Sequence, residues 1–197
     1  MEENVIVKTL LISRYEETVK KLKEKKENEI WVSELCQCKA KSEFRKSLWF
    51  METDAPSLIL GELVHRGLQG FLVSTFGGEV EVEVSKEFEG YLIKGRVDFL
   101  TTSEVVEIKY MRASKNELPL PHHVMQLQLY MWILNRKYGR LLYITPDGDF
   151  EIPMELKIND NTVKMYLQQW SSPKWDWECN YCAYSRFCPH KVKRRER

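Results

Sequence analysis

Residues 91–110, YLIKGRVDFLTTSEVVEIKY, are the stretch that decides the fold. Its two ends, 91–100 and 105–110, are rich in β-branched and aromatic side chains, which is typical of strands. The polar run between them, Thr-Thr-Ser-Glu at 101–104, has the composition of a turn. The pattern therefore predicts a two-stranded hairpin.

A four-residue turn fixes which side chains face each other across this hairpin. Leu100 then pairs with Val105, and Asp98 falls opposite Glu107, with Cβ atoms roughly 5 Å apart. Two facing carboxylates repel, so the arrangement favours a bound Mg²⁺ or Mn²⁺, which prefers hard oxygen ligands. Lys109 lies on the same face, where it can orient or help deprotonate an attacking water. The other interpretation is a solvated strand face with mixed charges.

The rest of the chain predicts helices before the hairpin and helices mixed with strands after it. Apolar residues recur every three to four positions, or alternate, between start signals such as Ser33 and Pro56 and the stop signal Gly77-Gly78. The expected helices are 4–26, 33–50, 58–76, 122–138 and a stretch capped by Asn159 or Asp160 that runs to about Trp170. The other expected strands are 31–32, 79–84, 140–145 and 149–154. This order predicts a mixed α/β fold with a central sheet.

Composition excludes some classes of protein. The 197 residues suffice for one large domain, or for one domain with a subdomain, and 43% of them are hydrophobic. The formal net charge is +1, so the total gives no support to nucleic-acid binding. The sequence has no apolar run long enough to span a membrane and no secretory signal pattern, so we expect a cytoplasmic protein without membrane association. In that compartment five cysteines indicate metal binding or catalysis rather than disulfides.

Two predicted helices carry polar side chains at a spacing of four residues. Gly61 and His65 share one face, where the glycine would let another backbone or DNA approach and the histidine could bind the same cation. His122, Gln126 and Tyr130 form a stripe in which Gln126 can bond a base or phosphate and Tyr130 can stack on an unpaired base. The alternatives are a histidine hydrogen-bonded near the core and a helix whose polar side faces water.

The cysteines suggest a metal cluster that joins distant parts of the chain. Cys179, Cys182 and Cys188 lie within ten residues, and the fourth ligand must be Cys36 or Cys38. Zinc and iron–sulfur clusters both use four cysteines. The three-plus-one spacing, with a proline directly after the last cysteine, favours iron–sulfur. Such a site would fasten the two ends of the chain together.

Taken together, the motifs resemble the RecB-like branch of the PD-(D/E)XK nucleases. They are, in chain order, Gly61-x-x-x-His65, Gly95-Arg96-Val97-Asp98, Glu107-Ile108-Lys109 and Gln126-x-x-x-Tyr130. With the flanking cysteines, the chain is most similar to the CRISPR-associated members that act in spacer acquisition. The resemblance covers about Trp31 to Pro189. It implies one RecB-like nuclease domain over 1–197, a central mixed sheet flanked by helices, in which 1–57 and 171–197 form an iron–sulfur subdomain.

The resemblance also implies roles for individual residues. The implied Mg²⁺ or Mn²⁺ ligands are His65, Asp98, Glu107 and the carbonyl of Ile108; the implied catalytic residues are Asp98, Glu107 and Lys109; the implied DNA-facing residues are Gln126 and Tyr130. The implied cluster is [4Fe-4S] in preference to [2Fe-2S], on Cys38, Cys179, Cys182 and Cys188. Members of the family often have Cys-Pro-Arg at the first cysteine, whereas this chain has Cys38-Lys39-Ala40. The frame that precedes it, Val32-Ser33-Glu34-Leu35, still assigns Cys38 as ligand and Cys36 as spare.

The implied activity is metal-dependent 5′ to 3′ exonuclease cleavage of single-stranded DNA, with endonuclease activity as a further option, in the processing of prespacers. The implied partners are single-stranded DNA and CRISPR integrase subunits, and a homo-oligomer stays open because the helix 4–26 is amphipathic. The main alternative is a non-catalytic DNA-binding adaptor that keeps the fold. A redox protein would leave Asp98, Glu107 and Lys109 without a role, and a zinc-stapled transcription factor is the third alternative.

Overall fold

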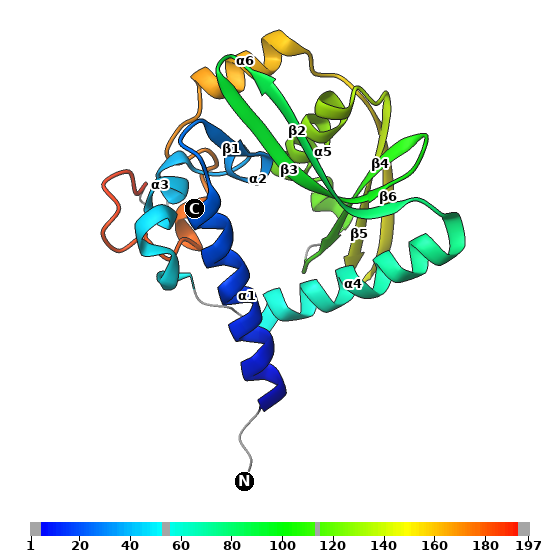
Figure 1. The fold of residues 1–197 in the computed structure, drawn as a ribbon, viewed down its shortest axis with the longest axis horizontal. Helices are drawn as coiled ribbons and strands as arrows, with labels where there is room; N and C mark the ends of the chain where they lie inside the picture. Colours follow the sequence, from blue (N-terminus) through cyan, green and yellow to red (C-terminus); the bar gives the residue numbers. More distant parts are fainter. Residues whose placement is uncertain (1–4, 53–55, 113–114, 193–197) are drawn as a thin grey trace.

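A six-stranded mixed sheet forms the centre of the molecule (Figure 1). The computed structural model describes residues 5–52, 56–112 and 115–192. The helices are α1 (Val5–Glu24), α2 (Val32–Leu35), α3 (Lys39–Leu48), α4 (Pro56–Phe76), α5 (Pro121–Leu134) and α6 (Asp160–Gln168). The strands are β1 (Glu29–Trp31), β2 (Glu79–Phe88), β3 (Tyr91–Leu100), β4 (Glu104–Tyr110), β5 (Tyr138–Thr145) and β6 (Gly148–Glu155). No helix in the described ranges is long and apolar enough to cross a membrane.

Strand β3 organises the sheet because three strands pair with it. β2 runs antiparallel to it over its whole length. β1 pairs in parallel with residues 92–94, and β4 pairs antiparallel with only Phe99 and Leu100. Since β2 occupies one edge of β3, β1 and β4 share the other edge, and residues 95–98 between them have no strand partner there. β4 then pairs in parallel with β5, and β5 antiparallel with β6.

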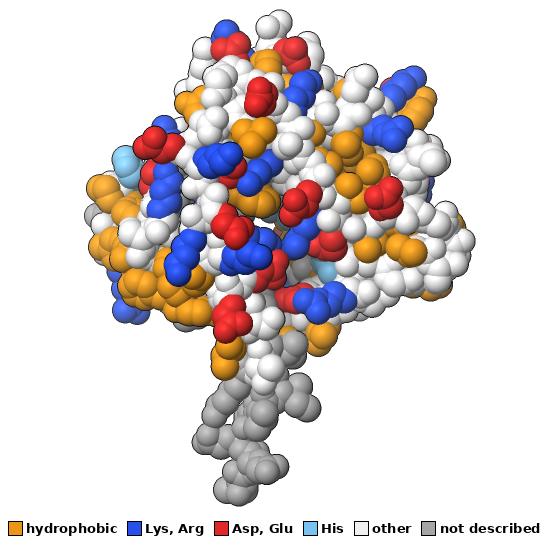
Figure 2. Space-filling model, in the orientation of Figure 1, with side chains coloured by type: hydrophobic (Ala, Val, Ile, Leu, Met, Phe, Trp, Pro, Cys, Tyr) orange, Lys and Arg blue, Asp and Glu red, His pale blue; other side chains and the backbone are white. Residues whose placement is uncertain are grey.

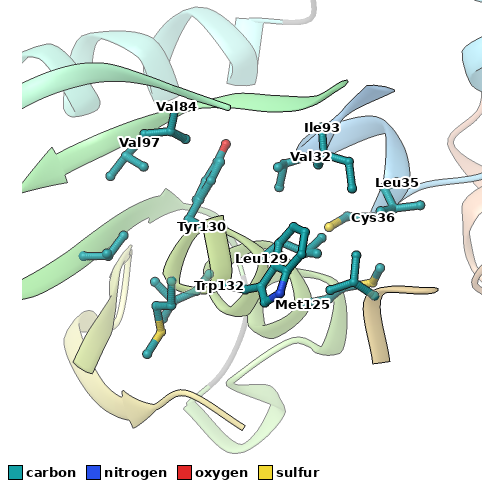
Figure 3. Packing of buried hydrophobic residues seen from close by; sticks show 14 of the residues in the cluster. Val32, Leu35, Cys36, Val84, Ile93, Val97, Met125, Leu129, Tyr130 and Trp132 are labelled. Carbon is teal, nitrogen blue, oxygen red and sulfur yellow. The ribbon is translucent and has the colours of Figure 1, made fainter. Parts of the chain in front are cut away.

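Each face of the sheet is covered by one main helix. Successive side chains of a strand point to opposite faces, so Leu142 packs on the α4 side and Leu141 on the α5 side. The α4 face buries a small cluster of Phe99, Val106, Ile108 and Leu142 against Leu68 and Leu72. The α5 face buries the larger cluster, in which the helix contributes Met125, Leu127, Leu129, Tyr130, Met131 and Trp132 (Figure 3).

The segments around α2 and α3 lie against the C-terminal tail (Figure 1). The tail donates hydrogen bonds to the backbone that links the two helices, from the Trp170 indole to the carbonyl of Gln37 and from the Trp175 indole to the carbonyl of Cys36, both at 2.8 Å. In the other direction, the N–H of Lys39 donates to the carbonyl of Ser171 at 2.9 Å. Two parts of the chain about 130 residues apart therefore complete each other's backbone hydrogen bonds.

Most of the expected elements are present, and the structure corrects some of their bounds. The strand expected at 31–32 lies at Glu29–Trp31 instead, because Val32 begins α2. The expected helix 33–50 is wrong, because it is split into α2 and α3, and Ser33 lies inside α2 rather than capping it. The reason is the tail, which satisfies the backbone groups that a continuous helix would use. Helix α5 ends at Leu134, earlier than expected, because Asn135 adopts a left-handed conformation with φ of 52°. Strand β2 continues to Phe88, beyond the expected end.

Candidate active site

Strands β3 and β4 open into a fork at the two acidic residues. The expected pairing of Leu100 with Val105 is confirmed, and Phe99 pairs with Val106. The ladder ends there, so Asp98 and Glu107 do not form the next backbone pair that the turn register predicts. The carboxylate of Asp98 takes the place of the missing strand instead, and its Oδ2 accepts a 2.7 Å hydrogen bond from the N–H of Ile108.

A chain of polar contacts runs from this fork into α5. Nζ of Lys109 donates to Oε1 of Glu107 at 2.6 Å and to Oε1 of Gln126 at 3.1 Å. Nε2 of Gln126 donates to the hydroxyl of Tyr130 at 3.3 Å. The catalytic residues expected on β4 and the DNA-facing residues expected on α5 therefore belong to one connected group.

Helix α4 brings His65 to the other side of the fork. Its Nδ1 lies 3.6 Å from Oδ1 of Asp98, and the backbone of Ile108 is a hydrogen-bond partner of the imidazole. The structure thus places His65, Asp98 and Ile108 together, with Glu107 next along β4. All four candidate ligands of the divalent cation surround the same opening in the sheet.

Burial shifts the pKa values of these groups strongly. It raises the pKa of Asp98 to about 6, although the charge of Lys109 and the hydrogen bond from Ile108 oppose it. Burial and the charge of Asp98 raise the pKa of Glu107 to about 7. Burial lowers the pKa of His65 and would lower that of Lys109, but the charges of Glu107 and Asp98 outweigh it and raise the Lys109 pKa. The site therefore holds two carboxyl groups that a nearby cation would ionise more easily.

One buried atom suggests what the site is built to hold. Oε2 of Glu107 is buried and has no hydrogen-bond partner among the described residues. A buried carboxylate oxygen without a partner is costly, and a divalent cation is the kind of group that satisfies it. In the present conformation no group of three or more His, Cys, Asp and Glu side chains in the described ranges is arranged to hold a metal ion. Of the other three carboxylate oxygens, Oδ2 of Asp98 accepts from Ile108, Oε1 of Glu107 accepts from Lys109, and Oδ1 of Asp98 lies 3.6 Å from His65.

The structure corrects two expectations about the motif residues. Tyr130 is 3% exposed, so its ring is not open to a base that would stack on it. It packs against Gly95, where an added Cβ would come within 2.5 Å of the ring, and it contacts Gln126. In Figure 3 the ring points toward Val84 and Val97 of the sheet. Gly61 is not a point of close backbone approach, because an added Cβ there would meet only the Tyr110 ring, at 3.9 Å.

The sequence did not single out three polar residues that contact the site, namely Gln69, Glu81 and Arg96, as its supports. The amide of Gln69 is buried and donates to Oε1 of Glu81 at 2.5 Å and to the carbonyl of Asp98 at 3.2 Å. Glu81 interrupts the β2–β3 ladder opposite Asp98 with φ of 54° and also pairs with Arg96 at 2.5 Å. Because Gln69 lies one turn after His65, a search for a continued spacing of four could have found it.

The four cysteines expected to hold a cluster line one small pocket. Cys38 comes from the start of α3 and lies there with Cys179, Cys182 and Cys188 of the tail. Thiol groups from four cysteines are the donor set of an iron–sulfur or zinc site, so the residue types fit such a group, although the described residues are not arranged around a metal position in the present conformation. Cys36 is elsewhere, 3% exposed in the core beside α5, and burial raises the pKa of its thiol to about 12 (Figure 3).

A buried glutamate organises this pocket. Oε1 of Glu178 accepts a 2.8 Å hydrogen bond from the N–H of Cys38. Its Oε2 accepts from the N–H groups of Lys174 and Trp175, both at 2.9 Å. One carboxylate therefore fixes the tail and the first cysteine in the same place. No signal in the sequence distinguishes this glutamate from the other acidic residues.

Comparison with known proteins agrees with this geometry. Residues 74–189 match the model of the PD-(D/E)XK nuclease superfamily. The chain is 36% identical over 204 residues to the CRISPR-associated exonuclease Cas4 of Saccharolobus solfataricus, a match that covers 95% of this chain and all of that protein. It also resembles the crystal structure of SSO0001, with a TM-score of 0.79 and 36% identity over 89% of this chain and 96% of that one. An alkaline exonuclease from Laribacter hongkongensis shares the fold at 14% identity, with a TM-score of 0.52 over 72% of this chain and 83% of that one.

These matches confirm the resemblance seen in the motifs. The superfamily match spans more than half of the chain, and the curated relative matches nearly all of it. The chain therefore belongs to the PD-(D/E)XK nuclease superfamily and, within it, to the family of the CRISPR-associated exonuclease Cas4.

Proposed function

We propose that this chain is a divalent-metal-dependent exonuclease that hydrolyses single-stranded DNA from 5′ to 3′. The observation that carries the proposal is the fork between β3 and β4, where Asp98, Glu107 and Lys109 meet His65 in one buried opening. The orphan oxygen of Glu107 supports a cation there. The polarity, the single-stranded substrate and any additional endonuclease activity rest on the family resemblance.

The residues that would hold Mg²⁺ or Mn²⁺ are His65, Asp98, Glu107 and the backbone carbonyl of Ile108. When bound, such an ion would polarise the scissile phosphate and lower the pKa of an attacking water. Lys109 is a cation, since its pKa is raised, so its ammonium group can hold that water and offset negative charge on the phosphate. Gln126 fixes the ammonium group from the α5 side.

Tyr130 acts on the strand indirectly in this proposal. Its buried hydroxyl accepts from Gln126, so the ring sets the position of the Gln126 amide. The amide oxygen of Gln126 then accepts from Lys109, which also donates to Glu107 at the fork. Gln126 is the partly buried member of the pair and therefore the one that can reach a phosphate or base.

For the cysteine pocket we propose an iron–sulfur cluster, [4Fe-4S] in preference to [2Fe-2S], on Cys38, Cys179, Cys182 and Cys188. The support is the shared pocket and the three-plus-one spacing. With its cluster, the part formed by 1–57 and 171–197 would serve as the subdomain that holds the N-terminal helices against the tail.

The biological role that we propose is the trimming of prespacer DNA in CRISPR adaptation. The support is the relative matched over the whole chain, which is named a CRISPR-associated exonuclease. In that role the protein would act in the cytoplasm beside integrase subunits, and the amphipathic α1 leaves self-association open. The alternative, a non-catalytic DNA-binding adaptor, is tested by the same experiment.

The test is a cleavage assay on single-stranded DNA labelled at the 5′ or the 3′ end. Protein purified without air is compared with its Asp98→Ala variant, with Mg²⁺ or Mn²⁺ or with a chelator. We expect metal-dependent shortening by the wild type and none by the variant, and the label that is lost first gives the polarity. If cluster-loaded wild type binds DNA but does not cut it, the adaptor function replaces the nuclease.

A further inference from the structure

Four aromatic rings gather where helix α5 begins. The ring of His122 lies 4.1 Å from that of His123, 4.9 Å from that of Trp177 and 6.2 Å from that of Trp175, centroid to centroid. Trp177 is 41% exposed, so one large ring of the group is open to solvent. The position of the Trp175 ring is fixed by its indole N–H, which donates to the carbonyl of Cys36.

This aromatic group is next to the candidate active site. His122 precedes Gln126 by four residues, just over one helical turn and about 6 Å along α5. Gln126 in turn contacts Lys109. Burial is the main cause that lowers the pKa values of His122 and His123, and the positive charge of Lys109 lowers them further. A strand that reaches Lys109 from this side therefore passes His122 and Trp177.

The cysteine-rich tail delivers Trp177 to this position. Trp177 directly precedes Glu178, whose carboxylate binds the N–H groups of Trp175 and Cys38. The contacts that assemble the cysteine pocket thus also hold the exposed indole beside α5. The Trp177 ring contacts the ring of His122 and is still 41% exposed, so part of it remains available for binding.

The surroundings suit a nucleotide better than an apolar segment of a protein. Helix α5 starts with Pro121 and has no side-chain cap and no acidic residue in its first turn, so the positive end of the helix is not neutralised there. Burial and the charge of Lys109 lower the pKa of His122 to about 4, which leaves a neutral ring at physiological pH. Its Nδ1 is buried without a hydrogen-bond partner among the described residues.

We infer that Trp177 and His122 form a stacking site for an unpaired nucleobase of the strand that enters the fork, with the start of α5 beside the adjacent phosphate. The inference rests on the proposed function only in that the substrate is DNA. Stacking on exposed aromatic rings is tolerant of sequence, so the site would favour single strands over duplexes without selecting a base.

The experiment measures binding in the Asp98→Asn background, so that cleavage does not interfere. Single-stranded oligonucleotides carrying 2-aminopurine at successive positions are titrated with this protein and with versions that add Trp177→Ala, Trp177→Phe, His122→Ala or Tyr181→Ala. Tyr181 is the matched control, because it is an aromatic residue of the same tail that is 84% exposed. A blunt hairpin duplex serves as the fully paired probe, and iron content shows whether the tail is intact.

We expect one 2-aminopurine position to be quenched on binding. Trp177→Ala should abolish that quenching and weaken single-strand binding about 5- to 150-fold, the range for one base–aromatic stack. Trp177→Phe should retain most of the affinity, and Tyr181→Ala all of it. His122→Ala should weaken binding as well, and it gives an answer outside the tail if Trp177→Ala loses iron.

The inference is overturned if Trp177→Ala and His122→Ala bind the single strand as the background does, or if hairpin binding falls equally. In the first case the rings serve another partner, such as an apolar protein segment. Failure of the nuclease is separate, since it is read from the cleavage assay: wild type that does not cut can still show the stacking, and wild type that cuts can lack it.

Discussion

The N–H of Ile108 donates a 2.7 Å hydrogen bond to Oδ2 of Asp98, at the point where the β3–β4 ladder stops. Ile108 is fully buried, so if Asp98 were removed no water could accept a hydrogen bond from its N–H. The side chain that defines the fork therefore also satisfies the backbone that the fork exposes. Asp98 has a structural role beside its proposed catalytic one.

The two roles of Asp98 can be separated with two variants. Asp98→Asn keeps an acceptor oxygen and removes the charge, whereas Asp98→Ala removes both. We expect both to reduce cleavage by about 10²-fold or more. In urea denaturation Asp98→Ala should be less stable than Asp98→Asn by about 1–3 kcal/mol, because only alanine leaves the Ile108 N–H unpaired. Equal stability of the two would show that the hydrogen bond contributes nothing.

Gln69 should hold α4, and with it His65, on the sheet. Gln69→Leu removes the donor that Glu81 and the carbonyl of Asp98 share. We expect a loss of about 1–2 kcal/mol in the free energy of unfolding, measured in urea. Arg66→Ala, on the exposed side of the same helix, is the control and should change stability by less than about 0.5 kcal/mol. A similar effect of the two substitutions would contradict the role of Gln69.

Gly95 should be required because Tyr130 packs against it. In Gly95→Ala the new Cβ would lie 2.5 Å from the buried ring, so the strand or the ring has to shift. We expect a destabilisation of about 1–3 kcal/mol, together with weaker cleavage because Gln126 loses its fixed partner. Gly67→Ala is the matched control: no atom lies within 4 Å of its added Cβ, and it should stabilise α4 by up to about 1 kcal/mol. Thermal denaturation of the three proteins decides.

The metal-free protein should lose stability as the pH rises from about 4 to about 7. In this window Asp98 and Glu107 bind more protons folded than unfolded, because their pKa values rise from 3.8 to about 6 and from 4.5 to about 7. The urea midpoint should therefore fall with pH, and Glu107→Gln should flatten the dependence. His65 contributes in the opposite direction, and Glu107→Gln enlarges that contribution because the charge of Glu107 raises the pKa of His65.

The stabilisation of the protein by added Mn²⁺ should increase with pH, whereas the stability of the metal-free protein should decrease. A cation that binds ionised carboxylates competes with their protons, so it should stabilise the protein more at about pH 8 than at about pH 5. An equal stabilisation at both pH values would place the Mn²⁺ away from the two buried carboxylates.

The two cysteines near the N-terminus should differ in their effect on the cluster. Cys38→Ala removes a thiol from the pocket, so anaerobically purified protein should contain less iron and show weaker visible absorbance. Cys36→Ala changes a buried core side chain and should leave the iron content unchanged. The reverse result would make Cys36 the ligand, and zinc in place of iron in the wild type would exclude the iron–sulfur proposal.

Much of the fold and the site follows from local patterns in the sequence. The strand 91–100 and the Leu100–Val105 register are confirmed because a polar turn fixes a hairpin. The family membership is confirmed because its motifs stand in the expected order. Spacing also brought His65 and Lys109 into the right region, since residues four apart on a helix, or two apart on a strand, share a face.

What the sequence could not predict depends on contacts between distant segments. The break between α2 and α3 is set by tail carbonyl and N–H partners more than 130 residues away. The end of the ladder at Phe99 is also a tertiary feature, because β4 pairs with β5 along its whole length but with only two residues of β3. Tyr130 is buried because Gly95 leaves room for its ring. The polar stripe on the helix does not show which strand residues pack against it.

The hydrogen bonds that Glu178 makes to Cys38 and the tail have a consequence for synthesis of the protein. On the ribosome, the helices around Cys38 emerge long before residues 178–188. Until then their backbone lacks its hydrogen-bond partners from the tail, and Cys38 has none of the three tail thiols beside it. The proposed cluster could be inserted only after nearly all of the residues up to Cys188 have been released from the exit tunnel. Nascent or truncated chains would therefore expose the thiols of Cys36 and Cys38 without their folded surroundings, which would make the last step of folding the one most sensitive to oxygen.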